Sequence, residues 1–223
     1  AVTAVLPIAA TDSASGTASA SISNKAITDA IAAAEKAAKD RKKTEDGIAL
    51  ALEVNMPQGA TSLTATLTQN SLKNLVNAGV KQLEINGAPV ALSFNLDALQ
   101  SIQSQASGGV TISISPVTEL SVSGQSVIGN RPVYRVTISY TDKDGNAQNI
   151  TSFGRGINEA HGYLFGVYVD DNGNASKINA SFYNANEGTI IIPTNHLSIY
   201  GVGYEEPSAK FTDVGKLCRW FFI

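Results

Sequence analysis

The chain has few of the residues on which catalytic, metal and redox sites depend. Its 223 residues include one cysteine, one tryptophan and two histidines, and only 16% of them are Asp, Glu, Lys or Arg. The single cysteine, Cys218, excludes a disulfide bond within the chain, so packing alone must hold the fold. The net charge of −3 supplies no positive field, and we predict no nucleic-acid partner. No apolar run approaches the roughly 20 residues of a membrane helix, so we predict no membrane span.

Sequence motifs of enzymes are missing as well. The two histidines, His161 and His196, lie far apart, and neither belongs to a helical HExxH zinc motif. The chain contains no GxSxG elbow, no phosphate-binding P-loop and no GxGxxG fingerprint. We therefore predict that the protein is not an enzyme, with no catalytic residues, no metal ligands and no cofactor.

Two acidic runs each open like a calcium-binding loop. They are Asp142-Lys143-Asp144-Gly145-Asn146 and Asp170-Asp171-Asn172-Gly173-Asn174. Neither is followed by the glutamate that completes an EF-hand loop. Asp, Asn and Gly are also the residues that hairpin turns require. The sequence favours hairpin turns at both places, with calcium as the weaker alternative.

The composition that remains is typical of an extracellular β-rich protein. Apolar residues make up 43% of the chain, which is enough for a substantial core, and neutral Ser, Thr, Asn and Gly take the place of charged residues. The chain begins with Ala1 rather than Met, which is expected of a secreted chain that has lost its signal peptide, or of a fragment.

Alternating apolar and polar residues predict roughly a dozen short strands, and a spacing of three to four predicts about three helices. The helices are expected at 24–42, 69–78 and 97–105, so they lie mostly in the first half. Residues 118–131 are expected to form a loop or one helical turn, and Asn86-Gly87 a hairpin turn. The strands after residue 163 are expected to form an antiparallel meander. The predicted fold class is α+β, β-dominated, with antiparallel, sandwich-like sheets.

The same patterns predict three segments. Residues 1–16 form an apolar N-terminal segment and linker, residues 17–204 form a β-rich domain with two lobes parting near 105–118, and residues 205–223 form a tether and an apolar tail. Aromatic residues gather late in the β-rich part, where they could form either a sugar-binding platform or ordinary core. They are Tyr163, Phe165, Tyr168, Phe182, Tyr183, Tyr200 and Tyr204.

Several short motifs give the chain a resemblance to a known family. It resembles the β-rich region that precedes surface-layer-homology repeats in secreted proteins of clostridia-like Gram-positive bacteria. The motifs are Leu164-Phe165-Gly166-Val167-Tyr168-Val169-Asp170, Asn172-Gly173-Asn174, Asn195-His196, Phe211-Thr212-Asp213-Val214, Asn95-Leu96-Asp97-Ala98-Leu99 and Gly129-Asn130-Arg131-Pro132-Val133. The resemblance covers roughly residues 45–215 and implies an extracellular, wall-associated, non-catalytic module.

The chain departs from that family in two ways. The stretch 154–162 is too short for a strand that the family carries there, which would leave a gap in a sheet, and no wall-binding repeat follows Gly215. A gap invites a strand from another chain. Both ends of the chain are apolar and of strand length, and the candidate exchanged residues are Val2, Val5, Leu6, Ile8, Trp220, Phe221, Phe222 and Ile223. The alternative is that a terminal strand closes its own sheet.

Together these observations predict a non-catalytic structural protein of the bacterial cell surface or wall. It would act as an S-layer-type or filament-forming module, and its partners would be copies of itself. The alternative is an extracellular spacer or carbohydrate-binding module that takes cell-wall polysaccharide.

Overall fold

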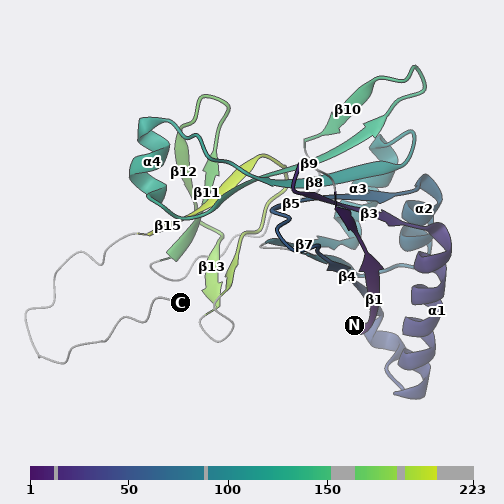
Figure 1. Ribbon diagram of the computed structural model, residues 1–223. Helices are drawn as coiled ribbons and strands as arrows, with labels where there is room; N and C mark the ends of the chain where they lie inside the picture. Colours follow the sequence, from purple (N-terminus) through teal and green to yellow (C-terminus); the bar gives the residue numbers. More distant parts are fainter. Residues whose placement is uncertain (13–14, 88–89, 152–163, 185–188, 205–223) are drawn as a thin grey trace, which may run out of the picture.

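The fold is mixed α/β with strands in the majority, as the sequence predicts in outline (Figure 1). The computed structural model describes residues 1–12, 15–87, 90–151, 164–184 and 189–204. These residues contain four α-helices and one short 3-10 helix, η1 (Thr44–Asp46), against the three or so helices expected.

The three predicted helices are present, and a side chain caps each of them. They are α1 (Asn24–Asp40), α2 (Gln69–Asn77) and α3 (Leu96–Gln105). Ser23, Thr68 and Asn95 accept a backbone N–H bond at their N-termini. The fourth helix, α4 (Val122–Ile128), occupies the stretch expected to be a loop or a single turn. The cap at Ser121 is what makes so short a helix start here.

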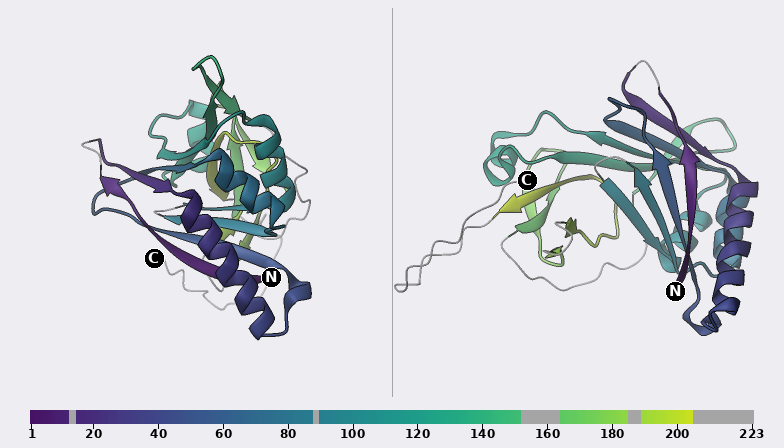
Figure 2. Two further views of the ribbon diagram at one scale, coloured as in Figure 1. Left: turned by 90° about the vertical axis from the view of Figure 1, so that its right-hand side faces the viewer. Right: turned by 60° about the horizontal axis from the view of Figure 1, so that its bottom comes forward.

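Sheet A contains four strands in the order β1-β4-β6-β7. Their bounds are β1 (Val2–Ala9), β4 (Ile48–Asn55), β6 (Gln82–Gly87) and β7 (Val90–Asn95). Helix α1 packs against β1 and β4, so this sheet and its helices occupy one end of the molecule (Figure 2).

Sheet B is longer and runs through both ends of the molecule, in the order β12-β11-β15-β9-β8-β5-β3-β2 with β10 paired to β9 (Figure 1). Its N-terminal strands are β2 (Thr11–Asp12), β3 (Thr17–Ile22), β5 (Ser62–Leu67) and β8 (Val110–Pro116). The remaining strands are β9 (Val133–Thr141), β10 (Ala147–Ile150), β11 (Leu164–Val169), β12 (Ala175–Ile178) and β15 (Ile199–Tyr204).

The sheets are only partly antiparallel, which corrects the sequence prediction. The pairs β1–β4, β4–β6 and β3–β5 are parallel. The chain between the two strands of each parallel pair includes α1 or α2, and a connection of that length lets the second strand run in the same direction as the first.

The expected late meander is also wrong. Strand β15 lies between β9 and β11, and β13 (Phe182–Asn184) pairs with β14 (Thr189–Ile191) in a separate two-stranded sheet. Short local patterns identify these strands but do not identify their partners, which lie far apart in the chain.

Asn86 and Gly87 belong to a strand and not to a turn. They pair with Ala91 and Val90 of β7. A Cβ atom at Gly87 would lie 2.8 Å from Cβ of Val54 and 3.3 Å from Cδ2 of Leu63. Close packing between β6 and its neighbours therefore explains this glycine, and it is not among the residues with positive φ.

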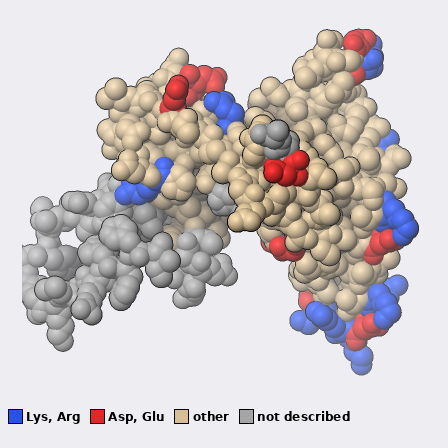
Figure 3. Space-filling view, viewed as in Figure 1, with Lys and Arg blue, Asp and Glu red and all other residues tan. Residues whose placement is uncertain are grey.

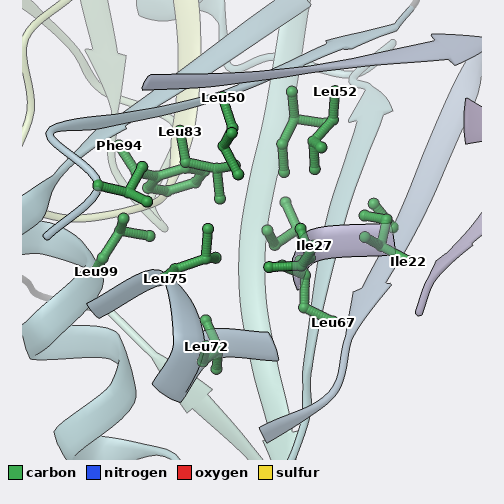
Figure 4. Packing of buried hydrophobic residues seen from close by; sticks show 14 of the residues in the cluster. Ile22, Ile27, Leu50, Leu52, Leu67, Leu72, Leu75, Leu83, Phe94 and Leu99 are labelled. Carbon is green, nitrogen blue, oxygen red and sulfur yellow. The ribbon is translucent and has the colours of Figure 1, made fainter. Parts of the chain in front are cut away.

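The larger hydrophobic core fills the space between the two sheets and α1, α2 and α3 (Figure 4). Its fully buried side chains include Ile27 of α1, Leu50 and Leu52 of β4, Leu75 of α2 and Leu99 of α3. A second, smaller core lies under α4 and contains Ile128, Val133, Phe165, Val167, Val169 and Ile199.

The two cores lie on opposite faces of sheet B. Along β9, Ile138 belongs to the larger core and Tyr134 packs against it, whereas Val133 belongs to the smaller core. Successive residues of a strand point to opposite faces, and the odd and even positions of β9 follow this rule. One face of sheet B therefore carries the smaller core near β15. At β3, β5 and β8, the same face points away from the larger core.

Candidate functional site

The first candidate site is the N-terminal strand β1, which contains four of the predicted assembly residues. It pairs in parallel with β4 along all eight of its residues, from Val2 opposite Ile48 to Ala9 opposite Asn55. It is the end strand of sheet A, so only one of its two edges is paired in the described part of the chain.

Residues of β1 alternate between the core and solvent. Val2 and Ile8 are 4% and 6% exposed and join the larger core, and Leu6 is half-buried against it. Val5 points to the other face and is 64% exposed. The strand therefore packs on the protein through one face only, and two of its side chains on that face are buried.

The C-terminal candidates Trp220, Phe221, Phe222 and Ile223 lie outside the described residues, as do His161 and Cys218. The expected gap beside residue 153 is not seen among the described strands. Strand β10 pairs with β9 from Ile138 to Thr141, and β15 continues the pairing from Val133 to Arg135. Between them, the Val136 N–H donates to the Ser198 carbonyl at 2.9 Å.

Among the residues whose side chains the structure describes, the late aromatic rings are divided over several places and do not form one platform. Tyr134, Tyr200 and Tyr168 lie opposite one another across β9, β15 and β11. The ring of His196 meets the Tyr168 ring edge-on, with 5.1 Å between centroids. Phe165 lies on the opposite face in the smaller core, with the Lys177 ammonium 4.5 Å from its ring centroid.

This tyrosine row is held by internal contacts. Tyr200 is 9% exposed, and its hydroxyl donates to the His196 carbonyl at 2.6 Å and lies 2.7 Å from the Thr194 hydroxyl. Burial raises the pKa of the Tyr200 phenol, and burial also raises the pKa of Tyr134. Such a row rigidifies the sheet, and its most central ring has no face left to offer a sugar.

The two acidic runs are hairpin turns in the structure, between β9 and β10 and between β11 and β12. Asp142 accepts the N–H groups of Asp144 and Asn146 at 2.9 Å, and Asp170 accepts those of Asn172 and Asn174 at 2.9 and 2.8 Å. The backbone N–H of Asn146 is the main cause that lowers the pKa of the Asp142 carboxyl, and the side-chain amide of Asn174 is the main cause that lowers the pKa of Asp170. Within the described ranges, no three or more His, Cys, Asp or Glu side chains are grouped to hold a metal ion.

A second candidate surface was not anticipated from the sequence. The outward residues of β3, β5, β8 and β9 are almost all Ser or Thr, and a groove lies at one end of them, lined in part by Ser21, Thr66 and Thr111. The alternation of Ser and Thr with apolar residues is visible in the sequence. The alignment of four such strands is not.

None of the helices in the described part of the chain is long and apolar enough to cross a membrane. Comparisons with family models, with curated proteins and with solved structures find no match to this chain.

Proposed function

We propose that the protein is a non-catalytic structural module of the bacterial cell surface that assembles by exchanging β1 between copies. One observation carries the proposal: β1 is a terminal strand, at the end of a sheet, whose whole length is paired with a single partner, β4. An exchanged strand of a neighbouring copy would make the same eight-residue pairing with β4.

Strand β1 buries fewer side chains than its partner β4. Fully burying a Val or Ile side chain contributes about 1.5–3 kcal/mol, and β1 has only Val2 and Ile8 fully buried. In β4, by contrast, Leu50 and Leu52 are completely enclosed, and six of its eight residues are buried. We expect an end strand of a sheet with so few buried side chains to open at a lower free energy than the rest of the fold.

Detachment of β1 would expose a slot between β4 and α1. Ile48, Leu50 and Val54 of β4 face the core, and α1 packs against both β1 and β4. Filling this slot with the strand of the next copy restores every contact, so exchange costs little beyond association. Because donor strand and slot are different surfaces, the contact is head-to-tail, and a head-to-tail contact that does not close into a ring gives a filament.

The cell-surface setting rests on composition and on the family resemblance of residues 45–215. Low charge and abundant Ser, Thr and Asn support an extracellular location. Assembly of copies is a task that needs no catalytic group, which accords with the predicted lack of one.

A disulfide placed across β1 and β4 tests the exchange. Val5 lies directly opposite Ala51 on the outer face of sheet A, so cysteines at both positions are close enough to bond. In a Cys218→Ser background, oxidation of V5C/A51C under assembling conditions should give a ladder of covalent multimers on a non-reducing gel. The single variant V5C is the matched control and should give dimers at most.

Covalent monomers alone, with β1 bonded to its own β4 at every concentration, would overturn the proposal. Negative-stain electron microscopy of the unmodified chain supplies an independent reading, since exchange predicts fibres that lengthen with protein concentration.

A further inference from the structure

The outer face of sheet B carries a regular array of hydroxyl groups. Ser19, Thr64, Ser113 and Thr137 lie directly opposite one another on β3, β5, β8 and β9. All four side chains are at least partly exposed, whereas the next residue along each strand is buried in the larger core. This set is the first row of what we call the hydroxyl face.

The second row is made in the same way one pleat further along. It consists of Ser21, Thr66, Thr111 and Ser139, again in direct register across β3, β5, β8 and β9. Neighbouring strands lie about 4.8 Å apart and alternate residues about 6.7 Å apart, so the eight hydroxyls form a grid. Helices α1, α2 and α3 pack with the larger core on the other face of this sheet.

These hydroxyls are turned to solvent and are hardly used by the fold. Among the described residues, the only hydrogen bond made by any of these eight hydroxyls is from Thr66 to the Ala20 carbonyl, and at 3.4 Å it is long. A hydroxyl both donates and accepts, so the remaining groups can bond to any uncharged partner that does the same.

The second row ends in an open groove of about 370 Å³. Ser21, Thr66, Thr111 and Gln69 form part of its lining. The amide nitrogen of Gln69 donates to the Ser107 carbonyl at 3.1 Å, which directs the amide and leaves its oxygen to accept. The volume is at the lower end of the range for small-molecule sites.

Charge and area decide what can occupy this face. The two rows contain no Lys, Arg, Asp or Glu, and the exposed Arg135 lies two residues before Thr137 on β9, outside the rows. On the side drawn in Figure 3 the charged side chains lie mostly around the outline of the molecule, with acidic groups also near its middle. A polyanion would find no cation in the rows. Two rows on four strands cover only about 250 Å², whereas each side of a stable protein complex buries about 800 Å². The rows also lack the aromatic and Arg anchors of protein interfaces.

We propose that the hydroxyl face binds an uncharged polysaccharide strand, laid along the rows with one sugar unit in the groove. The hydroxyls of such a strand match the donors and acceptors of the grid, and its narrow width matches the small area. Without aromatic rings in the rows, binding depends on hydrogen bonds and is weak for each sugar unit. This function adds to assembly and does not depend on it.

Native affinity electrophoresis of the full chain tests the proposal, with hydroxyethylcellulose and galactomannan as the two probes. The variant T66V/T111V deletes two hydroxyls of the groove and keeps the β-branched shape. Each net hydrogen bond contributes about 0.5–1.5 kcal/mol, so the double variant should bind at least about fivefold more weakly than the unmodified chain. The control T3V removes an exposed threonine hydroxyl from β1, on the other sheet, and should bind like the unmodified chain.

Three results would overturn the proposal, each with folding checked by amide NMR. The first is that neither polysaccharide retards the unmodified chain. The second is that T66V/T111V binds as tightly as the unmodified chain. The third is that only an anionic carboxymethylcellulose gel retards the protein. Self-association that disappears in T66V/T111V would instead assign the face to a second copy. The V5C/A51C experiment does not touch this face, so either proposal can fail without the other.

Discussion

The hydroxyl of Ser121 donates a hydrogen bond to the carbonyl oxygen of Gly173, 52 residues further along the chain. The same oxygen accepts the Gly124 N–H at 3.1 Å and so caps α4. One side chain thus starts the helix and fixes it to the turn between β11 and β12. The space there is tight, because a Cβ atom at Gly173 would lie 2.7 Å from Cβ of Ser121.

The substitution Ser121→Ala removes both bonds, and we expect it to lower the free energy of unfolding by about 1–3 kcal/mol. Loss of an N-cap costs about 1 kcal/mol, and loss of the bond to Gly173 adds a similar amount. Urea denaturation measures the change. Ser126→Ala is the matched control, since this exposed serine lies on α4 and bonds only the Ser123 carbonyl among the described groups. Equal losses in the two variants would contradict the role of Ser121.

The smaller core depends on a glycine that packs against an aromatic ring. A Cβ atom at Gly203 would overlap the ring of Phe165 and would lie 2.8 Å from Cγ2 of Val167. We expect Gly203→Ala to destabilise the protein by about 1–3 kcal/mol through overpacking. Differential scanning calorimetry measures the effect.

The double variant G203A/F165L provides the control for that mechanism. A smaller side chain at 165 makes room for the added methyl group, so the double variant should lose less stability than the sum of the two single variants. Simple additivity would show that the ring of Phe165 is not what Gly203 accommodates.

Local features of this fold could be predicted from the sequence, and pairings could not. The spacing of Ile27, Ile31 and Ala34 defines α1, and Ser23 marks its start. Nothing in the strand patterns indicates that β15 inserts between β9 and β11. Gly87 misled the prediction because Asn-Gly usually signals a turn, whereas here glycine is required by the closeness of Val54.

The candidate sites likewise have parts that the sequence predicts and parts that it does not. The apolar alternation of residues 1–10 is enough to predict a strand at the terminus, and β1 is such a strand. Its parallel partner β4 is separated from it by α1, so the slot it fills could not be predicted. The hydroxyl face is a property of register, since Thr64 and Ser113 become neighbours only when β5 and β8 align.

The two Asp turns should lose stability in acid, because each depends on an ionised carboxylate. The pKa of Asp142 is lowered by the backbone N–H of Asn146 and then by the Gln148 side chain, and that of Asp170 by the side chain and backbone of Asn174. A lowered pKa means that the carboxylate stabilises the folded turn above the unfolded value of about 3.9. This contribution is lost as the pH falls through the lower, folded value.

NMR titration of the side-chain carboxyl carbons should therefore give midpoints below about 3.9 for both residues. The Asn146 and Asn174 amide resonances should follow the same curves, because these N–H groups are the donors. Asp142→Asn removes the first transition and leaves the second unchanged. Midpoints at or above the unfolded value would contradict the turn geometry.

A charged residue placed on either face of β1 tests whether its inward side chains hold the strand in the sheet. Ile8 is 6% exposed and faces the core, whereas Val5 is 64% exposed on the opposite face. A carboxylate cannot enter the core without a partner, so Ile8→Asp should detach the strand and leave its amides open to hydrogen exchange. Val5→Asp should keep β1 docked and change stability by about 0.5 kcal/mol or less.

If exchange of β1 builds the assembly, Ile8→Asp should also abolish fibres while Val5→Asp retains them, because a donor strand enters a neighbour through the same face. Protected β1 amides in Ile8→Asp, or fibres that survive it, would show that the inward side chains of β1 are not what holds the strand.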